Sequence, residues 1–212
     1  MADQLGHPSG MVGTRVLAPL WNRRNAALND AAWQRLHVKP ADHVLDVGFG
    51  GGYLLGRIAA AAANGYAAGV DTSQAMVAYS QKRYRPLIDA GRLGLLCGCA
   101  EALPLASGHF DKACSVNSIF YWDDAARSIS ELGRVLADNG LLVLCFTCRE
   151  SLQGKGFSGH GLVLYDATDV ENMLSMAGFH QIVVDHLTDR HRAFWCMTAV
   201  KASRQPDWPD KR

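Results

Sequence analysis

Three glycines at alternate positions follow a short apolar run that contains an acidic residue. The run His43–Val47 includes Asp46, and Gly48, Gly50 and Gly52 come next, ahead of a segment with helical periodicity. A strand that passes through a glycine loop into a helix lets ligand atoms lie against bare backbone at the helix N-terminus. The spacing is not the G-x-G-x-x-G of dinucleotide-binding folds, and a carboxylate here would repel a pyrophosphate. The pattern favours a ligand with an ammonium group near Asp46.

A second acidic residue, Asp71, ends the next apolar run. A carboxylate in this place accepts hydrogen bonds from both hydroxyls of a ribose, as in folds that bind NAD. The alternative is that Asp71 caps the helix that follows, although Thr72 or Ser73 can fill that role. The residue therefore indicates an adenosine ligand with free ribose hydroxyls.

The third motif, Gly98-Cys99-Ala100-Glu101-Ala102-Leu103-Pro104, is followed by a further apolar run that Phe110-Asp111 opens. In this order, the three motifs resemble the class I S-adenosylmethionine-dependent methyltransferases. The resemblance is to the small-molecule subgroup that includes the ubiquinone and menaquinone biosynthesis methyltransferases, and it covers about residues 40–201. It implies an α/β fold with a Rossmann-like, seven-stranded, mostly parallel sheet and helices on both faces.

The same resemblance implies S-adenosylmethionine as cofactor and assigns its contacts. In the family the glycine loop packs on the methionine part, the acidic residue holds the ribose, and the third motif follows the adenine edge. The matching residues are Asp46, Gly48, Phe49, Gly50, Gly52, Asp71, Thr72, Met76, Cys99, Ala100, Glu101 and Asn117. Many relatives have Asp where this chain has Cys99, and a thiol cannot supply a carboxylate contact to the adenine amino group. Backbone at Ala100 can still contact the ring.

Candidates for the acceptor side follow the fourth apolar run. In the family this strand end faces the transferred methyl group, so Tyr121 and Trp122 are candidate pocket residues, or else they pack the domain edge. Methyl transfer from a sulfonium mainly needs alignment and exclusion of water. A base can assist a phenol, carboxylic acid or thiol, and His7, His160 and Tyr121 are the catalytic candidates. Residues 116–122, at the end of the fourth apolar run, lack the N/D-P-P-F/Y pattern of family members that methylate amino groups. This absence weighs against DNA base methylation.

Short apolar runs alternate with helical segments along most of the chain, which predicts a mostly parallel sheet with helical crossovers. Helices are expected after the glycine loop, from the cap Asp123 to Asn139-Gly140, and over Ala167–Ala177. The expected strands are His43–Val47, Ala67–Val70, Leu93–Gly98, Lys112–Val116, Leu141–Phe146, Gln181–Val184 and Phe194–Val200.

Domain organisation follows from the places where this alternation begins and ends. Residues 1–39 have a different character, rich in Asn, Arg and Trp, and predict an N-terminal helical lid. Residues 40–202 form the expected cofactor-binding domain, and residues 203–212 are predicted to be a flexible tail.

Composition limits the possible partners. The 212 residues are 49% hydrophobic and 19% charged, with a net charge of +1, so the chain should fold alone and has no general field to hold nucleic acid. The apolar runs are too short to span a membrane and the N-terminus lacks an apolar signal core, so we expect a cytoplasmic protein.

Six cysteines without a secretion signal predict reduced thiols. Five of them are expected to be buried in strands, namely Cys97, Cys99, Cys114, Cys145 and Cys196. The pair Cys145-x-x-Cys148 is not expected to bind zinc.

The sequence thus predicts a methyltransferase that acts on a small molecule through an O, N, S or C atom. Three alternatives stay open. A non-catalytic S-adenosylmethionine-binding protein would keep the cofactor motifs and lose the acceptor pocket. An NAD-dependent oxidoreductase would show the dinucleotide glycine spacing, which is absent. A protein or RNA methyltransferase would need a basic or extended docking surface.

Overall fold

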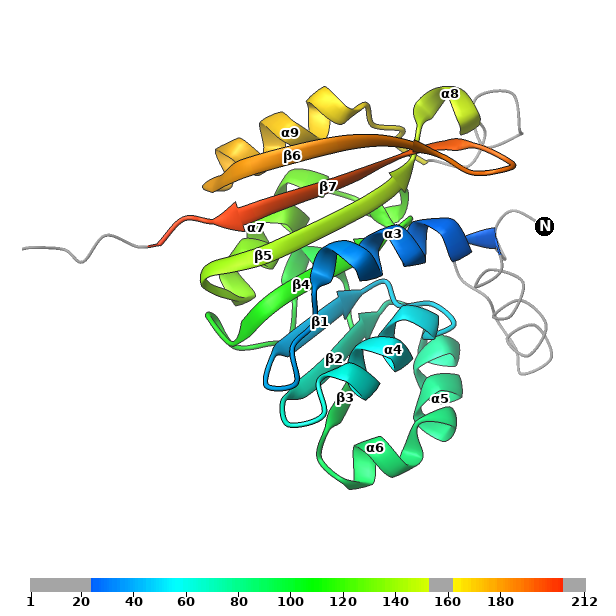
Figure 1. Cartoon of the computed structure of the whole chain (residues 1–212), viewed down its shortest axis with the longest axis vertical. Helices are drawn as coiled ribbons and strands as arrows, with labels where there is room; N and C mark the ends of the chain where they lie inside the picture. The colour runs from blue at the N-terminus through cyan, green and yellow to red at the C-terminus, as the bar shows by residue number, and fades with distance from the viewer. Residues whose placement is uncertain (1–23, 153–161, 204–212) are drawn as a thin grey trace, which may run out of the picture.

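The structure is a computed structural model that describes residues 24–152 and 162–203 (Figure 1). The candidate bases His7 and His160 lie outside the described residues, as do residues 1–23 of the expected lid and 204–212 of the expected tail. Within the described ranges, no helix is both long and apolar enough to cross a membrane.

One seven-stranded sheet organises the chain, with the strand order β3-β2-β1-β4-β5-β7-β6. All neighbours from β3 to β5 are parallel, whereas β7 is antiparallel to both β5 and β6. The strands are β1 (His43–Val47), β2 (Tyr66–Asp71), β3 (Leu93–Cys97), β4 (Phe110–Val116), β5 (Leu136–Thr147), β6 (Phe179–Thr188) and β7 (Ala193–Lys201). All seven strands predicted from the apolar runs are present, and the mostly parallel sheet is confirmed.

Helices cover both faces of the sheet, as predicted, and each face has its own buried cluster. Helices α3, α4 and α5 bury their apolar residues in one cluster, and α7 and α9 bury theirs in the other (Figure 1). The helices are α3 (Ala26–Leu36), α4 (Tyr53–Ala61), α5 (Gln74–Arg83), α6 (Arg85–Asp89), α7 (Ala125–Val135), α8 (Arg149–Leu152) and α9 (Ala167–Met176), with short 3₁₀ turns η1 (Ala100–Ala102) and η2 (Ile119–Tyr121).

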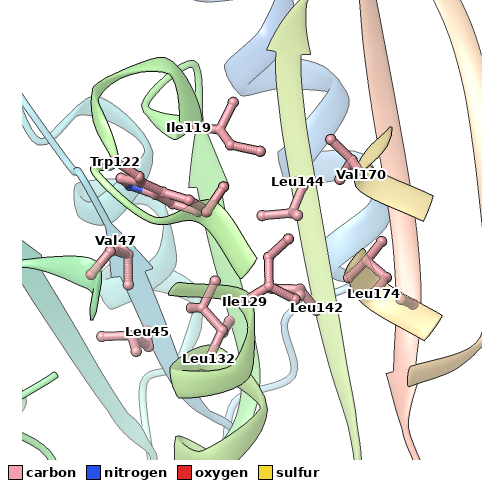
Figure 2. Close-up of a cluster of buried hydrophobic side chains, with 14 of the residues drawn as sticks. Leu45, Val47, Ile119, Trp122, Ile129, Leu132, Leu142, Leu144, Val170 and Leu174 are labelled. Carbon is pink, nitrogen blue, oxygen red and sulfur yellow. The ribbon is translucent and has the colours of Figure 1, made fainter. Parts of the chain in front are cut away.

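Alternation along the strands explains the two clusters. Leu45 and Val47 of β1 face Ile129 and Leu132 of α7, as Figure 2 shows, because successive strand residues point to opposite faces. Val44 points to the other face and joins the cluster of α3 and α4. Full burial of each such aliphatic side chain contributes about 1.5–3 kcal/mol, so both helix layers are firmly attached to the sheet.

The predicted helix after β4 starts one residue later than expected and ends well before Asn139-Gly140. Asp124, not Asp123, is its N-cap, because the Asp124 carboxylate accepts a hydrogen bond of 2.9 Å from the Arg127 N–H. The helix ends at Val135, and the chain turns at once into the long strand β5, within which Asn139 takes a left-handed φ of 62°. The helix over residues 167–176 is confirmed, with Gly178 just beyond it at φ 83°.

The described part of the expected lid is a core helix. Leu28, Ala32 and Leu36 of α3 are fully buried, and the helix packs across β5, β4 and β7. Residues 26–36 therefore cover one face of the sheet. The division of the chain at residue 39 stays a prediction.

Two of the five cysteines expected to be buried in strands are exposed. Cys114, Cys145 and Cys196 are buried as predicted, but Cys97 and Cys99 are exposed. The reason is topological, since Cys97 ends β3, an edge strand with one neighbour, and Cys99 lies just beyond it, before η1. The described residues contain no cluster of three or more His, Cys, Asp or Glu side chains that could hold a metal ion.

Candidate active site

A cavity of about 630 Å³ opens at the carboxyl ends of β1, β2 and β4, which is within the usual range for a small-molecule site. The chain runs from β1 outward to β2 and β3, then returns to β4 on the other side of β1. Ligands of open α/β sheets bind at such a point, where the direction of winding reverses. The antiparallel strand β7 begins at the same edge, because Thr147 at the end of β5 pairs with Phe194.

The glycine loop forms the floor of this cavity. Gly48, Gly50 and Gly52 all have left-handed backbones, with φ of 75°, 50° and 69°. A Cβ atom on Gly48 would lie 2.6 Å from the Ser118 Cβ, so only glycine fits against the chain that leaves β4. A Cβ on Gly50 would meet no atom within 4 Å, and Gly50 lines the cavity. The loop therefore leaves space for a ligand directly above its backbone.

Two side chains from other elements hold the loop in this shape. Asp71, at the end of β2, accepts hydrogen bonds of 2.8 Å from the N–H groups of Gly50 and Ser73. The Tyr84 hydroxyl donates to the Gly52 carbonyl oxygen at 2.7 Å. Asp71 thus links β2 to the loop and lines the cavity as well, whereas Tyr84 is a positioning residue that the sequence analysis missed.

Asp46 is a buried carboxyl group at the base of the cavity, only 2% exposed. Burial raises its pKa from 3.8 to about 7; the hydrogen bond from Cys114 opposes this rise, and the nearby charge of Asp71 adds to it. A buried carboxyl with a pKa this high gains from a cation placed beside it. Its environment fits the ammonium-bearing ligand that the sequence predicted.

The predicted adenine contacts are only partly brought together. Phe49, Thr72, Met76 and Ala100 line the cavity, but Cys99 does not. Glu101, also outside the lining, has a structural role, because its carboxylate accepts a 2.8 Å hydrogen bond from the Asp123 N–H. It ties the chain after β3 to the segment that precedes α7.

Aromatic side chains form the wall beside β4. Trp122 is buried and Tyr121 is 46% exposed, and both line the cavity together with Phe120. Burial raises the pKa of the Tyr121 hydroxyl, although the positive charge of Arg24 opposes the rise. The described residues also place His191, which the sequence analysis did not select, in the lining.

A closed ring of four polar side chains lies at the far end of the cavity. Asn117 accepts a 2.8 Å hydrogen bond from the Thr147 hydroxyl, and Thr147 accepts one of 3.0 Å from Arg192. Arg192 donates to the Asn25 side-chain oxygen at 2.8 Å, and the Asn117 amide donates to the same oxygen at 3.3 Å. The ring joins the ends of β4 and β5 to the start of β7 and to the residue before α3. Asn117, predicted to border the cofactor, lines the cavity and anchors this ring.

We expect Thr147→Val to lower the free energy of unfolding by about 1–2 kcal/mol, because the nearly isosteric valine removes the hydroxyl from a fully buried site and leaves Arg192 without one acceptor. Chemical denaturation of both proteins measures this difference. Ser130→Ala, which removes an exposed helix hydroxyl on α7, is the control and should change stability by less than about 0.5 kcal/mol. An equal stability of Thr147→Val and the wild type would show that the ring does not contribute.

This strand order, with the glycine loop after β1 and a carboxylate at the end of β2, is the architecture of class I S-adenosylmethionine-dependent methyltransferases. Residues 45–144 match the family model described as a methyltransferase domain. The chain therefore contains a class I methyltransferase domain, for which S-adenosylmethionine is the cofactor.

Comparisons with individual proteins agree with this assignment. The chain is 29% identical over 127 residues to the uncharacterized methyltransferase YdaC of Bacillus subtilis, covering 60% of this chain and 68% of YdaC. The fold is similar to one chain of the Haloferax volcanii complex of the Trm112 methyltransferase activator, with a TM-score of 0.77, 18% identity, and coverage of 91% and 97%. It also resembles the Haemonchus contortus phosphoethanolamine N-methyltransferase 2 in complex with S-adenosyl-L-methionine, with a TM-score of 0.69, 20% identity, and coverage of 84% and 53%.

Other curated relatives are named as O-methyltransferases or as a C-methyltransferase of ubiquinone and menaquinone biosynthesis. The chain spans between 38% and 58% of the length of these relatives. Because the match covers only part of these relatives, the acceptor is a matter for proposal.

Proposed function

We propose that the protein transfers a methyl group from S-adenosylmethionine to a small-molecule acceptor held in the same cavity. The observation that carries the proposal is the shape of this cavity, which extends from the glycine loop and Asp71 past the aromatic wall to the ring around Arg192. A cofactor on the loop and an acceptor beside Tyr121 and Trp122 would share one enclosed space. Alignment and exclusion of water in such a space are the main requirements of an in-line displacement.

The residues present fit the cofactor. Space above Gly50 accepts a ligand without displacing any side chain, and Asp71 offers two oxygens to the ribose hydroxyls. Asp46 stabilises a positive charge at the base, which suits the ammonium of the methionine part. When bound, S-adenosylmethionine supplies an electrophilic methyl group on a sulfonium. Met76 and Ala100 provide apolar contacts for the adenine.

The chain's own residues would exclude water and orient the acceptor. Buried Trp122 and partly exposed Tyr121 form an apolar wall with one polar tip. The Tyr121 hydroxyl keeps its proton at neutral pH, because burial raises its pKa, so it can donate a hydrogen bond to an acceptor oxygen. His7, His160 and Tyr121 stay the candidate catalytic residues, and the acceptor atom stays open among O, N, S and C.

Cofactor selectivity gives the first test. We expect S-adenosylmethionine and S-adenosylhomocysteine to stabilise the wild-type protein by about 2.7 kcal/mol at 100 times their dissociation constants, which raises the melting temperature by about 5–10 °C. NAD and NADP should have no effect, because their pyrophosphate would approach the acidic side chain of Asp46 beside the glycine loop. Differential scanning fluorimetry measures the melting temperature with each of the four compounds. Stabilisation by NAD alone would favour an oxidoreductase and overturn the proposal.

Transfer itself is tested with S-adenosylmethionine labelled in its methyl group and a panel of phenols, carboxylic acids, amines and thiols. The proposal expects S-adenosylhomocysteine to form above the acceptor-free rate with at least one class. Cofactor binding without transfer to any member of the panel would favour the non-catalytic binding protein.

A further inference from the structure

The cavity is electrically polarised along its length. Asp46 and Asp71 lie at the glycine-loop end, whereas Arg24 and Arg192 lie at the end formed by β7 and the residues before α3. The Arg192 guanidinium reaches the ends of β5 and β4, because it donates to Thr147 and to the Asn25 side-chain oxygen, which also accepts from Asn117. The two ends therefore present opposite charges to different parts of whatever the cavity holds.

The positive end holds more cations than its carboxylate can balance. Asp189 is the acidic partner here, with its oxygen 3.7 Å from the Arg192 Nε. Its other oxygen accepts hydrogen bonds from the N–H groups of His191 and Arg192, at 2.7 and 2.9 Å. Asp189 thus pairs with Arg192 and is not part of the cavity lining, and no ion pair among the described residues joins Arg24 to a carboxylate. Together, Arg24, Arg192 and Asp189 carry a net positive charge.

Arg192 is held in place more firmly than a surface arginine. Its side chain is 11% exposed, and it donates to Thr147, to Asn25 and to the backbone oxygen of Arg24. Burial lowers its pKa, the charge of Asp189 opposes that change, and the charge of Arg24 adds to it. A guanidinium that is desolvated and close to a second cation gains from a bound anion, and its fixed orientation reduces the entropy lost on binding.

We propose that Arg192 and Arg24 form a subsite for a carboxylate or similar anionic group of the methyl acceptor, next to the aromatic wall of Tyr121 and Trp122. This inference rests on the proposed function and narrows it to acceptors that carry a negative charge beside an apolar or aromatic body. An alternative source of the same chemistry is the carboxylate of the cofactor's methionine part. The experiment below separates the two sources.

The test uses benzoate as the anionic probe and benzamide as its neutral isostere, each titrated into protein saturated with S-adenosylhomocysteine. Isothermal titration calorimetry should show benzoate binding at least about 10-fold more tightly than benzamide, the usual effect of one charge-assisted hydrogen bond. Arg192→Gln should bring the two affinities to within about 2-fold. Arg190→Gln is the matched control, because Arg190 lies in the same turn but outside the cavity lining, and it should keep the full preference for benzoate.

Arg192→Gln also removes hydrogen bonds of the ring, so a second variant, Arg24→Gln, tests the subsite without changing them. Arg192 donates a hydrogen bond to the backbone oxygen of Arg24, not to its side chain, so Arg24→Gln leaves the ring in place. We expect it to lower the preference for benzoate about 3- to 10-fold, with an unchanged melting temperature. Equal affinity of the wild type for benzoate and benzamide, with S-adenosylhomocysteine bound, would overturn the subsite while leaving the proposed function intact.

Comparison of S-adenosylhomocysteine with 5′-methylthioadenosine, which lacks the amino-acid part, identifies the source of the anion. The proposal expects Arg192→Gln to change both affinities by less than about 3-fold. A loss of about 10-fold or more for S-adenosylhomocysteine alone would assign Arg192 to the cofactor carboxylate and overturn the proposal. Failure of the wild type to bind S-adenosylhomocysteine at all would instead reject the proposed function.

Discussion

Asp71→Ala is expected to weaken binding of S-adenosylhomocysteine by about 100- to 10,000-fold. The variant removes the charged acceptor for two ribose hydroxyls, and each such hydrogen bond contributes about 1.5–3 kcal/mol. It also takes an acceptor away from the Gly50 and Ser73 N–H groups, which loosens the glycine loop. Isothermal titration calorimetry measures the affinity. Asp123→Ala, at an exposed carboxylate outside the cavity lining, is the control and should bind as the wild type does.

Asp71 is expected to contribute both by binding the ribose and by supporting the glycine loop. An analogue of S-adenosylhomocysteine that lacks the 2′-hydroxyl separates these two contributions. If Asp71 binds the ribose, the wild type should lose about 10-fold or more affinity for this analogue, and Asp71→Ala should discriminate much less between the two ligands. Equal discrimination in both proteins would reduce Asp71 to a support of the loop. An Asp71→Ala affinity within about 3-fold of the wild type would contradict both roles.

Asp46→Asn is expected to stabilise the protein and to weaken cofactor binding at the same time. The folded protein holds a proton on Asp46 up to a pH of about 7, whereas the unfolded chain releases it near its ordinary pKa of 3.8. The folded state binds more protons in this interval, so wild-type stability should fall as pH rises from about 4 to 7. An amide avoids this cost, so above pH 7 the variant should be more stable by about 2–4 kcal/mol, or about 5–10 °C in melting temperature.

The sign of each effect makes this prediction specific. Near pH 4 both proteins carry a neutral side chain at position 46, so their stabilities should converge there. The neutral amide cannot balance an ammonium group, so affinity for S-adenosylhomocysteine at pH 8 should fall about 10-fold or more. Thermal unfolding across pH and calorimetry measure the two quantities. Asp30→Asn, at an exposed carboxylate on α3, is the control for charge alone, and a variant at position 46 that is destabilised at pH 8 would contradict the argument.

The features that sequence could predict are those made by neighbours along the chain. The strands and the glycine loop follow from periodicity and from residues within short segments, and each appears as expected, with Asp71 at the end of β2. The hydrogen bond that Glu101 accepts from the Asp123 N–H could not be predicted, because Asp123 belongs to a later segment. The exposure of Cys97 depends on β3 being an edge strand, which no local pattern records.

The acceptor end was the hardest part to foresee. Tyr84 reaches Gly52 from the junction of α5 and α6, and nothing in its surrounding sequence marks that contact. Arg192 lies in a turn between β6 and β7, and its partner Asn25 belongs to an N-terminal stretch without a motif that marks the contact. Such contacts depend on the antiparallel insertion of β7 beside β5, which brings distant segments to one edge of the sheet.

The same insertion has a consequence for the order in which the protein assembles. The hydrogen bond from the Gly50 N–H to Asp71, which shapes the glycine loop, joins residues 21 positions apart, whereas the ring needs Asn25 and Arg192, which are 167 positions apart. Closure of long loops costs more entropy than closure of short ones, and distant contacts form later in folding. The ring should therefore be among the last parts of the cavity to form, after the glycine loop has taken its shape.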